Sequence, residues 1–145
     1  MNAATRGMIL HVDDEPLVLR TLAMVLEGDG YSVSGAASGP EALRLAGRGL
    51  RPDVLIVDFN LDPQMNGAEV AEELRLILGY APPIILLSGD PSNAECPWVV
   101  DTPIWLARKP INPLLLLAAM PSLVELSRST RGLTGSRPWG ILARG

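Results

Sequence analysis

The chain has little cysteine, few aromatic side chains and no long apolar segment. Its single cysteine, Cys96, leaves no intramolecular disulfide possible and fits a reducing compartment. Aromatic residues make up 4% of the 145 residues, so the core must be largely aliphatic. The strongly apolar runs Leu114–Met120 and Ile84–Leu87 fall far short of the ~20 residues that span a bilayer. Met1–Gly7 has no apolar stretch of the kind found in secretion signals.

Basic residues are also few. The 12 Lys and Arg residues are outnumbered by 16 Asp and Glu, which gives a net charge of −4 and a pI near 4.9. This balance argues against a nucleic-acid-binding surface. A mean hydropathy of +0.24 excludes a disordered chain. At roughly 150 residues per domain, we expect one small cytoplasmic domain that neither binds DNA directly nor enters a membrane.

Short apolar runs alternate with longer segments of helical period, and this order predicts the fold. Three of the runs are almost continuously apolar, which is typical of parallel strands covered by helices on both faces. The short connections predict right-handed βαβ crossovers and an α/β three-layer sandwich. The predicted strands are Met8–Val12, Tyr31–Ala36, Val54–Asp58, Ile84–Ser88 and Ile104–Ala107.

The predicted helices lie between these strands and after the last one. They are Pro16 to the stop signals at Gly28 and Gly30, Pro40–Gly47 capped by Ser38 or Gly39, Ala68–Leu78 ending at Gly79, and Pro113–Ser127 capped by Asn112. The segment before the fifth strand, Pro91–Thr102, contains two prolines and is followed by a third. A helix there, the fourth in order, is therefore expected to be short or distorted.

Polar side chains stand at the carboxyl ends of four predicted strands. They are Asp13 and Asp14, Asp58, Ser88, and Lys109. In an open parallel sheet these ends border the ligand-binding crevice, so we expect the five side chains to converge. Three close carboxylates repel one another unless a cation lies among them, and an oxygen-lined site of this kind suits Mg²⁺. Together with Lys109 and Ser88, such an ion would neutralise a transferring phosphoryl group, with one carboxylate as the nucleophile.

The fragments VDDEP, VLIVDFNLDPQMNG, ILLSGD and ARKP, in this order between residue 8 and about 127, resemble the receiver domain of two-component response regulators. The resemblance implies a five-stranded parallel sheet of order 2-1-3-4-5. It implies that Asp58 accepts the phosphoryl group and that Ser88 and Lys109 contact it. It further implies a cis Lys109-Pro110 bond and a small residue at Gly89. The implied Mg²⁺ ligands are Asp13, Asp14, Asp58 and the backbone carbonyl of Asn60.

Each residue also has a purely structural interpretation. Asp13, Asp14 and Glu15 could cap the helix that follows Pro16. Asp58 could be a loop cap, Ser88 an ordinary turn residue, and Lys109 a solvated surface lysine. His11, inside the first strand, is expected to be a satisfied or edge-facing core residue, and Cys96 is expected to be inert.

The chain departs from the family pattern in three places. The loop from Asp58 to Gly67 is one residue longer than usual, and we expect a bulge around Asp62–Gln64. Leu106 stands where the family places a Tyr or Phe, with Trp105 one residue earlier, so either the register shifts or the aromatic switch is absent. The prolines of Pro91–Thr102 alter the face that usually contacts partners.

Asn60 and Asp90 are small polar residues at positions that, in the family, border the path of the water that attacks the phosphoryl group. Such residues should admit and orient water, which predicts dephosphorylation within minutes or less.

The resulting hypothesis is a stand-alone receiver, residues 7–128, with a C-terminal tail at 129–145 and no output domain. A histidine kinase or histidine phosphotransfer protein would donate the phosphoryl group, Mg²⁺ would be required, and the signal would leave by protein–protein contact. The chain would not be a conventional enzyme, and would be a monomer or a phosphorylation-dependent dimer.

Three alternatives remain open. One is a receiver module of a hybrid histidine kinase, and another is a degenerate receiver that serves only as a scaffold. The third is a small aspartyl-nucleophile phosphatase, which needs a second acid two residues after the nucleophile. Asn60 follows Asp58 at that distance and Pro16 follows Asp14, so the sequence disfavours this third alternative.

Overall fold

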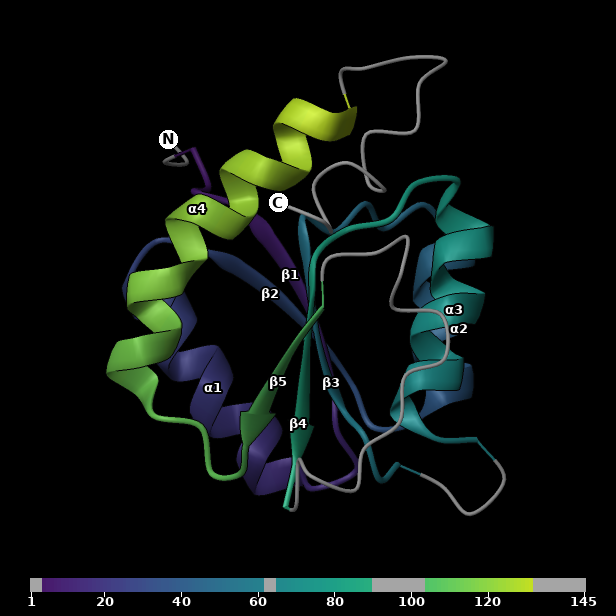
Figure 1. The fold of residues 1–145 in the computed structure, drawn as a ribbon, viewed down its shortest axis with the longest axis horizontal. Coiled ribbons are helices and arrows are strands. Elements are labelled where there is room, and N and C mark those ends of the chain that lie inside the picture. The colour runs from purple at the N-terminus through teal and green to yellow at the C-terminus, as the bar shows by residue number, and fades with distance from the viewer. Residues whose placement is uncertain (1–3, 62–64, 90–103, 132–145) are drawn as a thin grey trace.

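A computed structural model describes residues 4–61, 65–89 and 104–131 as a single α/β unit (Figure 1). The strands are β1 (Met8–Val12), β2 (Ser32–Ala36), β3 (Val54–Asp58), β4 (Ile84–Ser88) and β5 (Ile104–Arg108). The helices are α1 (Pro16–Gly28), α2 (Gly39–Gly47), α3 (Gly67–Leu78) and α4 (Pro113–Arg131). All strand pairs are parallel and the order is β2-β1-β3-β4-β5. The fold class and the strand order implied by the family resemblance are thus confirmed.

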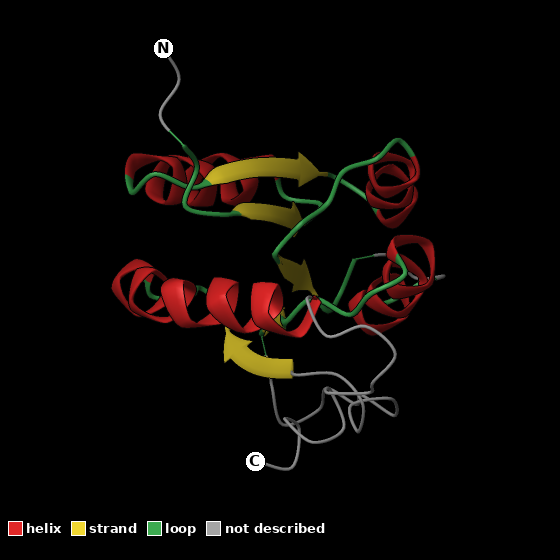
Figure 2. Cartoon of the chain, turned by 90° about the horizontal axis from the view of Figure 1, so that it is seen from above, coloured by secondary structure: helices red, strands yellow, loops and turns green. Residues whose placement is uncertain are grey.

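The sheet separates two apolar cores. Helices α1 and α4 cover one face and α2 and α3 the other, so the sandwich has three layers (Figures 1 and 2). Along β1, Ile9 packs with the α1/α4 core while Leu10 and Val12 pack with the α2/α3 core. This alternation follows from the two-residue period of a strand. Every residue of β3 and β4 is buried, as expected for continuously apolar central strands.

The helix ends largely follow their capping residues. The Ser38 hydroxyl accepts a hydrogen bond from Glu41 N at 3.2 Å, and Asn112 Oδ1 accepts one from Leu114 N at 2.8 Å, as the sequence predicts. Helix α3 begins one residue earlier than predicted, because Asn66 and Glu69 form a reciprocal capping box. Helix α4 continues to Arg131, four residues beyond the predicted end at Ser127.

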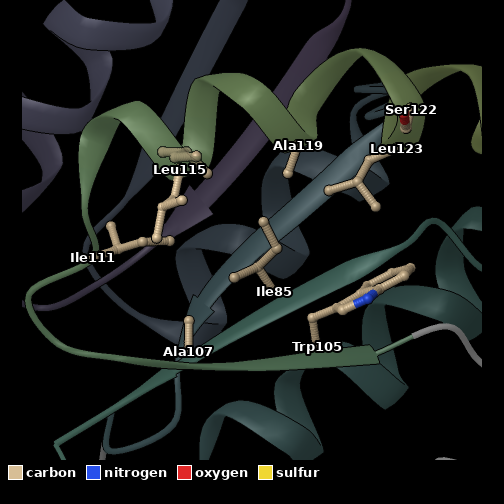
Figure 3. Close-up of a pocket in the computed structure, with 9 residues that line it drawn as sticks. Ile85, Trp105, Ala107, Ile111, Leu115, Ala119, Ser122 and Leu123 are labelled. Atoms are coloured by element: carbon tan, nitrogen blue, oxygen red, sulfur yellow. The ribbon is translucent and has the colours of Figure 1, made fainter.

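Strand β5 lies at the sheet edge in unshifted register. Trp105 pairs with Ile85 and Leu106 with Leu86, so the side chains of Trp105 and Leu106 point to opposite faces of the sheet. Trp105 faces α4 and lines an apolar pocket of about 350 Å³ with Ile85 and Leu123 (Figure 3). Trp105 therefore does not take the place of the usual aromatic residue. Leu106 occupies that position, and its side chain is 45% exposed.

Several predictions fall outside the described residues. These are the short or distorted helix at Pro91–Thr102, the bulge at Asp62–Gln64, the roles of Asp90 and Cys96, and the tail beyond Arg131. Within the described ranges, no helix combines the length and the apolar character needed to cross a membrane.

Candidate functional site

The carboxyl ends of the central strands bring the predicted acids together. Asp13 and Asp14 follow β1, and Asp58 is the last residue of β3. One carboxylate oxygen from each of these residues, and one from Glu15, lie within 4.8 Å of one another. The sequence predicted the three aspartates at this site but not Glu15. The uninterrupted acidic run before Pro16 was the signal available for it.

Lys109, which directly follows β5, contacts three of the four acids of this cluster. Its Nζ atom lies 3.1 Å from Glu15 Oε1, 3.2 Å from Asp58 Oδ2 and 3.4 Å from Asp13 Oδ2. Its backbone N–H donates to the carbonyl of Ser88 at 2.9 Å, which fixes the residue beside the end of β4. The peptide bond to Pro110 is cis, as the resemblance implies. A solvated surface lysine, the structural alternative, does not describe this ion-paired, mostly buried side chain.

The three carboxylates keep the Lys109 ammonium charged. Partial burial lowers the pKa of Lys109, but hydrogen bonds to Glu15 and Asp58 and the nearby charge of Asp13 outweigh burial and raise it above its usual value. Lys109 is therefore a permanent cation at neutral pH. One positive charge faces four carboxyl groups, so the cluster has room electrostatically for a further cation.

Asp13 and Asp58 are both buried and held by backbone donors. Asp13 Oδ1 accepts from Glu15 N at 2.9 Å, and Asp58 Oδ1 accepts from Asn60 N at 3.1 Å. Burial raises the pKa of Asp13, the hydrogen bond from Glu15 N lowers it, and the neighbouring charge of Asp58 raises it further. The first helix begins after Glu15, whose side chain makes no capping bond. The structure therefore gives little support to helix capping as the purpose of these acids.

The acid cluster fits a small hard cation. Asp13 Oδ2 is buried and has no hydrogen-bond partner among the described residues, and all the ligand atoms offered by the cluster are carboxylate oxygens. Oxygen ligands of this kind suit Mg²⁺. Asp14 is exposed at the mouth of the cluster, and Ser88 is buried at the end of β4. The assignment of the Asn60 carbonyl as a ligand stays a prediction.

The expectation that His11 is a core residue is confirmed, but the residue is neither edge-facing nor satisfied by the described residues. His11 lies in β1, which pairs with strands on both sides, so it is not at an edge. Its side chain is fully buried, and neither ring nitrogen has a hydrogen-bond partner within the described part of the chain. Its Nε2 atom lies 3.9 Å from Asp13 Oδ2. Burial, and secondarily the charge of Lys109, lowers the pKa of His11 to about 4, so the imidazole is neutral at pH 7.

Comparisons with known proteins agree with this geometry. Residues 9–102 match the response regulator receiver domain family. The chain is 41% identical over 90 residues to the DNA-binding response regulator MtrA of Mycolicibacterium smegmatis, which is 62% of this chain and 38% of MtrA. The chain thus spans well under half the length of that relative.

Solved structures extend the likeness across most of the fold. The chemotaxis response regulator CheY4 of Vibrio cholerae superimposes with a TM-score of 0.70 at 31% identity, covering 83% of this chain and 99% of CheY4. The receiver domain of the hybrid histidine kinase CckA superimposes with a TM-score of 0.67 at 32% identity, covering 81% and 99% of the two chains.

Proposed function

Because this chain belongs to the response regulator receiver domain family, we propose that it accepts a phosphoryl group on Asp58 from a histidine kinase or a histidine phosphotransfer protein. The observation that carries the proposal is the arrangement around Asp58. Its carboxylate lies at the end of a buried strand, in contact with the Lys109 ammonium and within 4.8 Å of three further acids. Two buried carboxylates beside two exposed ones repel one another and have little structural use, whereas phosphoryl transfer depends on this kind of positioning and electrostatic stabilisation.

In the proposed reaction, an Asp58 carboxylate oxygen attacks the phosphorus atom. The bond from phosphorus to the donor's imidazole nitrogen breaks, and an acyl phosphate forms on Asp58. The hydrogen bond from Asn60 N to Asp58 Oδ1 holds the carboxylate in a fixed orientation for this attack. Lys109, already charged and beside Asp58 Oδ2, is placed to neutralise the phosphoryl oxygens, and the Ser88 hydroxyl would donate to one of them.

Asp13, Asp14, Asp58 and the Asn60 carbonyl would hold Mg²⁺. When bound, the ion would supply positive charge against the phosphoryl oxygens and relieve the repulsion among the carboxylates.

The signal would leave through contacts with another protein. New bonds from the phosphoryl oxygens to Ser88 and Lys109 would shift the population between two states of the domain. With Leu106 at the usual aromatic position and Trp105 facing α4, this shift would not use the common aromatic switch. The chain would catalyse only its own phosphorylation and dephosphorylation, in the cytoplasm, and is not proposed to be an enzyme in the usual sense.

A second candidate is a receiver module that works within a hybrid histidine kinase. The likeness to the CckA receiver supports it, and the chemistry at Asp58 would be the same. Direct DNA binding is stated in the name of MtrA, of which this chain matches 38%. For the residues present here, with a pI near 4.9, we propose contacts with proteins rather than with DNA.

The test is phosphorylation by acetyl phosphate, with and without Mg²⁺, followed by intact-protein mass measurement. The wild-type chain should gain about 80 Da, the mass of one phosphoryl group, only when Mg²⁺ is present. Asp58→Asn should gain nothing. Asp29→Asn, which removes an exposed carboxylate paired with Arg6, should gain as much as wild type. A gain that does not need Mg²⁺, or an equal gain in Asp58→Asn, would contradict the proposal.

The same assay measures how long the phosphoryl group lasts. Asn60, beside the acceptor, and Asp90, outside the described residues, are both small and polar. They should admit and orient water, so the phosphoryl group should be lost within minutes once the donor is removed. Retention for many hours would contradict this part of the proposal and leave the assignment of Asp58 intact.

A further inference from the structure

The least explained polar group in the described structure is the His11 imidazole. It is fully buried, and both of its nitrogens lack hydrogen-bond partners among the described residues. Asp13 Oδ2 is buried and has no hydrogen bond among the described residues; Lys109 Nζ pairs with it at 3.4 Å, and His11 Nε2 lies 3.9 Å away. Buried polar groups without a hydrogen bond are costly and rare, so an imidazole that has none, beside a carboxylate oxygen held only by an ion pair, calls for an explanation.

His11 Nε2 and Asp13 Oδ2 can form a donor–acceptor pair. A neutral imidazole carries a proton on one nitrogen and a lone pair on the other. With the proton on Nε2, the ring presents a donor to the carboxylate oxygen, whereas with the proton on Nδ1 it presents a lone pair to an anion. The carboxylate therefore selects the Nε2–H form. The 3.9 Å separation is about 1 Å beyond hydrogen-bond length, which a small movement of the carboxylate closes.

The rest of the Asp13 side chain is already constrained. Oδ1 accepts from Glu15 N at 2.9 Å, and Lys109 Nζ lies 3.4 Å from Oδ2. Glu15 N therefore fixes one oxygen, but the other is held only by a lysine that also contacts Glu15 and Asp58. A donor in the core behind Asp13 would fix Oδ2 even when Lys109 turns to another anion.

We propose that His11 is a positioning residue for Asp13: its Nε2–H donates to Asp13 Oδ2 and holds the carboxylate in the orientation that binds Mg²⁺. This inference rests on the proposed metal site. His11 touches neither the ion nor the phosphoryl group and acts only through Asp13. Hydrogen-bond partners of ligating groups commonly change metal affinity by 10- to 100-fold.

The first test is nitrogen NMR of the imidazole. His11 is the only histidine in the 145 residues, so an untagged, ¹⁵N-labelled chain gives one unambiguous imidazole signal. The Nε2–H form is expected at pH 7, with a change in the Nε2 shift when Mg²⁺ is added. A proton on Nδ1 in the Mg²⁺-bound chain would overturn the inference.

The second test is Mg²⁺ titration by calorimetry. His11→Leu removes the donor and should weaken Mg²⁺ binding about tenfold, with little change of stability in metal-free buffer, because the lost bond to Asp13 is offset by removal of the buried, unpartnered Nδ1 atom. His11→Gln keeps an N–H donor and should bind within about threefold of wild type. Ile9→Val, in the same strand and facing the same core, is the matched control and should leave Mg²⁺ affinity unchanged.

The outcomes separate this inference from the proposed function. Mg²⁺ binding by wild type with equal affinity in His11→Leu would overturn the role of His11 and leave the metal site standing. Equal weakening in His11→Leu and Ile9→Val would show a packing effect and also overturn it. Failure of the wild-type chain to bind Mg²⁺ would contradict the proposed metal site and this inference with it. If His11→Leu does not fold, the NMR measurement on the wild-type chain still decides.

Discussion

The Nζ atom of Lys109 lies 3.2 Å from Oδ2 of Asp58, although 51 positions separate the two residues in the chain. The contact depends on the sheet. Asp58 ends β3, Ser88 ends the neighbouring β4, and the bond from Lys109 N to the Ser88 carbonyl fixes the lysine one strand further along. The ammonium group is thereby held over the acid cluster instead of extending into solvent.

Replacing this lysine should have opposite effects on the two steps of the proposed reaction. Lys109→Met removes a cation that competes with Mg²⁺ for Asp13 and Asp58, so Mg²⁺ should bind more tightly. It also removes positive charge from the transferring phosphoryl group, so phosphorylation by acetyl phosphate should slow by about 100-fold. Calorimetry and the rate of mass gain measure the two effects.

The neighbouring residue provides the control for Lys109. The Arg108 guanidinium lies at the surface, 3.5 Å from the Gly89 carbonyl. Arg108→Met should change neither the Mg²⁺ affinity nor the phosphorylation rate by more than about twofold, because this exposed charge pairs with none of the four acids of the cluster. A phosphorylation rate in Lys109→Met equal to that of Arg108→Met would show that charge at this position does not assist the transfer.

Much of the fold and most of the site could be predicted because they depend on local sequence. Continuous apolar runs specify central parallel strands, and side chains at the carboxyl ends of such strands converge whatever the loops do. Asp13, Asp58 and Lys109 could therefore be placed together before any contact was known. Asn112 likewise predicted the start of α4, because a cap acts over only two or three residues.

The remaining features depend on contacts across the fold. Helix α4 extends to Arg131 because Arg128 and Arg131 both pair with Asp53, more than 70 positions away, and Arg131 also stacks on Tyr80. No local signal near Ser127 reveals those partners. The lack of hydrogen-bond partners for the buried His11 imidazole could not be predicted either, because it depends on which side chains pack around β1.

Gly67→Ala should displace the backbone of Asp58, the proposed phosphoryl acceptor. A Cβ atom at Gly67 would overlap the Asp58 carbonyl oxygen and lie 2.9 Å from Phe59 Cα, both of which are backbone atoms. The backbone after β3 would have to shift, at a cost of about 2 kcal/mol in the free energy of unfolding. Phosphorylation should slow in the same variant. Gly28→Ala, with open space around the added atom, should leave both unfolding and phosphorylation near wild type; equal loss in the two variants would refute the steric explanation.

Asp53→Asn should loosen the end of α4. The Asp53 side chain is 5% exposed, accepts from Met8 N at 2.9 Å and pairs with Arg128 and Arg131. The amide can still accept from Met8 N but loses the charge, and the arginines can partly rehydrate, so we expect a loss of about 2 kcal/mol in urea unfolding. Asp29→Asn breaks an exposed pair with Arg6 and should cost under about 1 kcal/mol. A larger loss in Asp29→Asn than in Asp53→Asn would contradict this account.

His11 should make the metal-free fold sensitive to mild acid. Above pH 6.5 the imidazole is neutral in both the folded and the unfolded chain and contributes nothing. Because burial lowers the folded pKa from 6.5 to about 4, only the unfolded chain takes up the proton between these values. The unfolded state then binds more protons, so stability falls as the pH falls from 6.5 to 4.

The size of this effect is on the order of 3 kcal/mol by pH 4, and His11→Leu should abolish it. The charged groups that face His11, Asp13 and Lys109, remain in both proteins, so the difference between their urea-unfolding curves at each pH isolates the imidazole. That difference should be flat above pH 6.5 and should grow in favour of the leucine variant below it. Parallel pH profiles for the two proteins would mean that the folded chain protonates His11 as easily as the unfolded chain does, which a fully buried imidazole beside Lys109 should not allow.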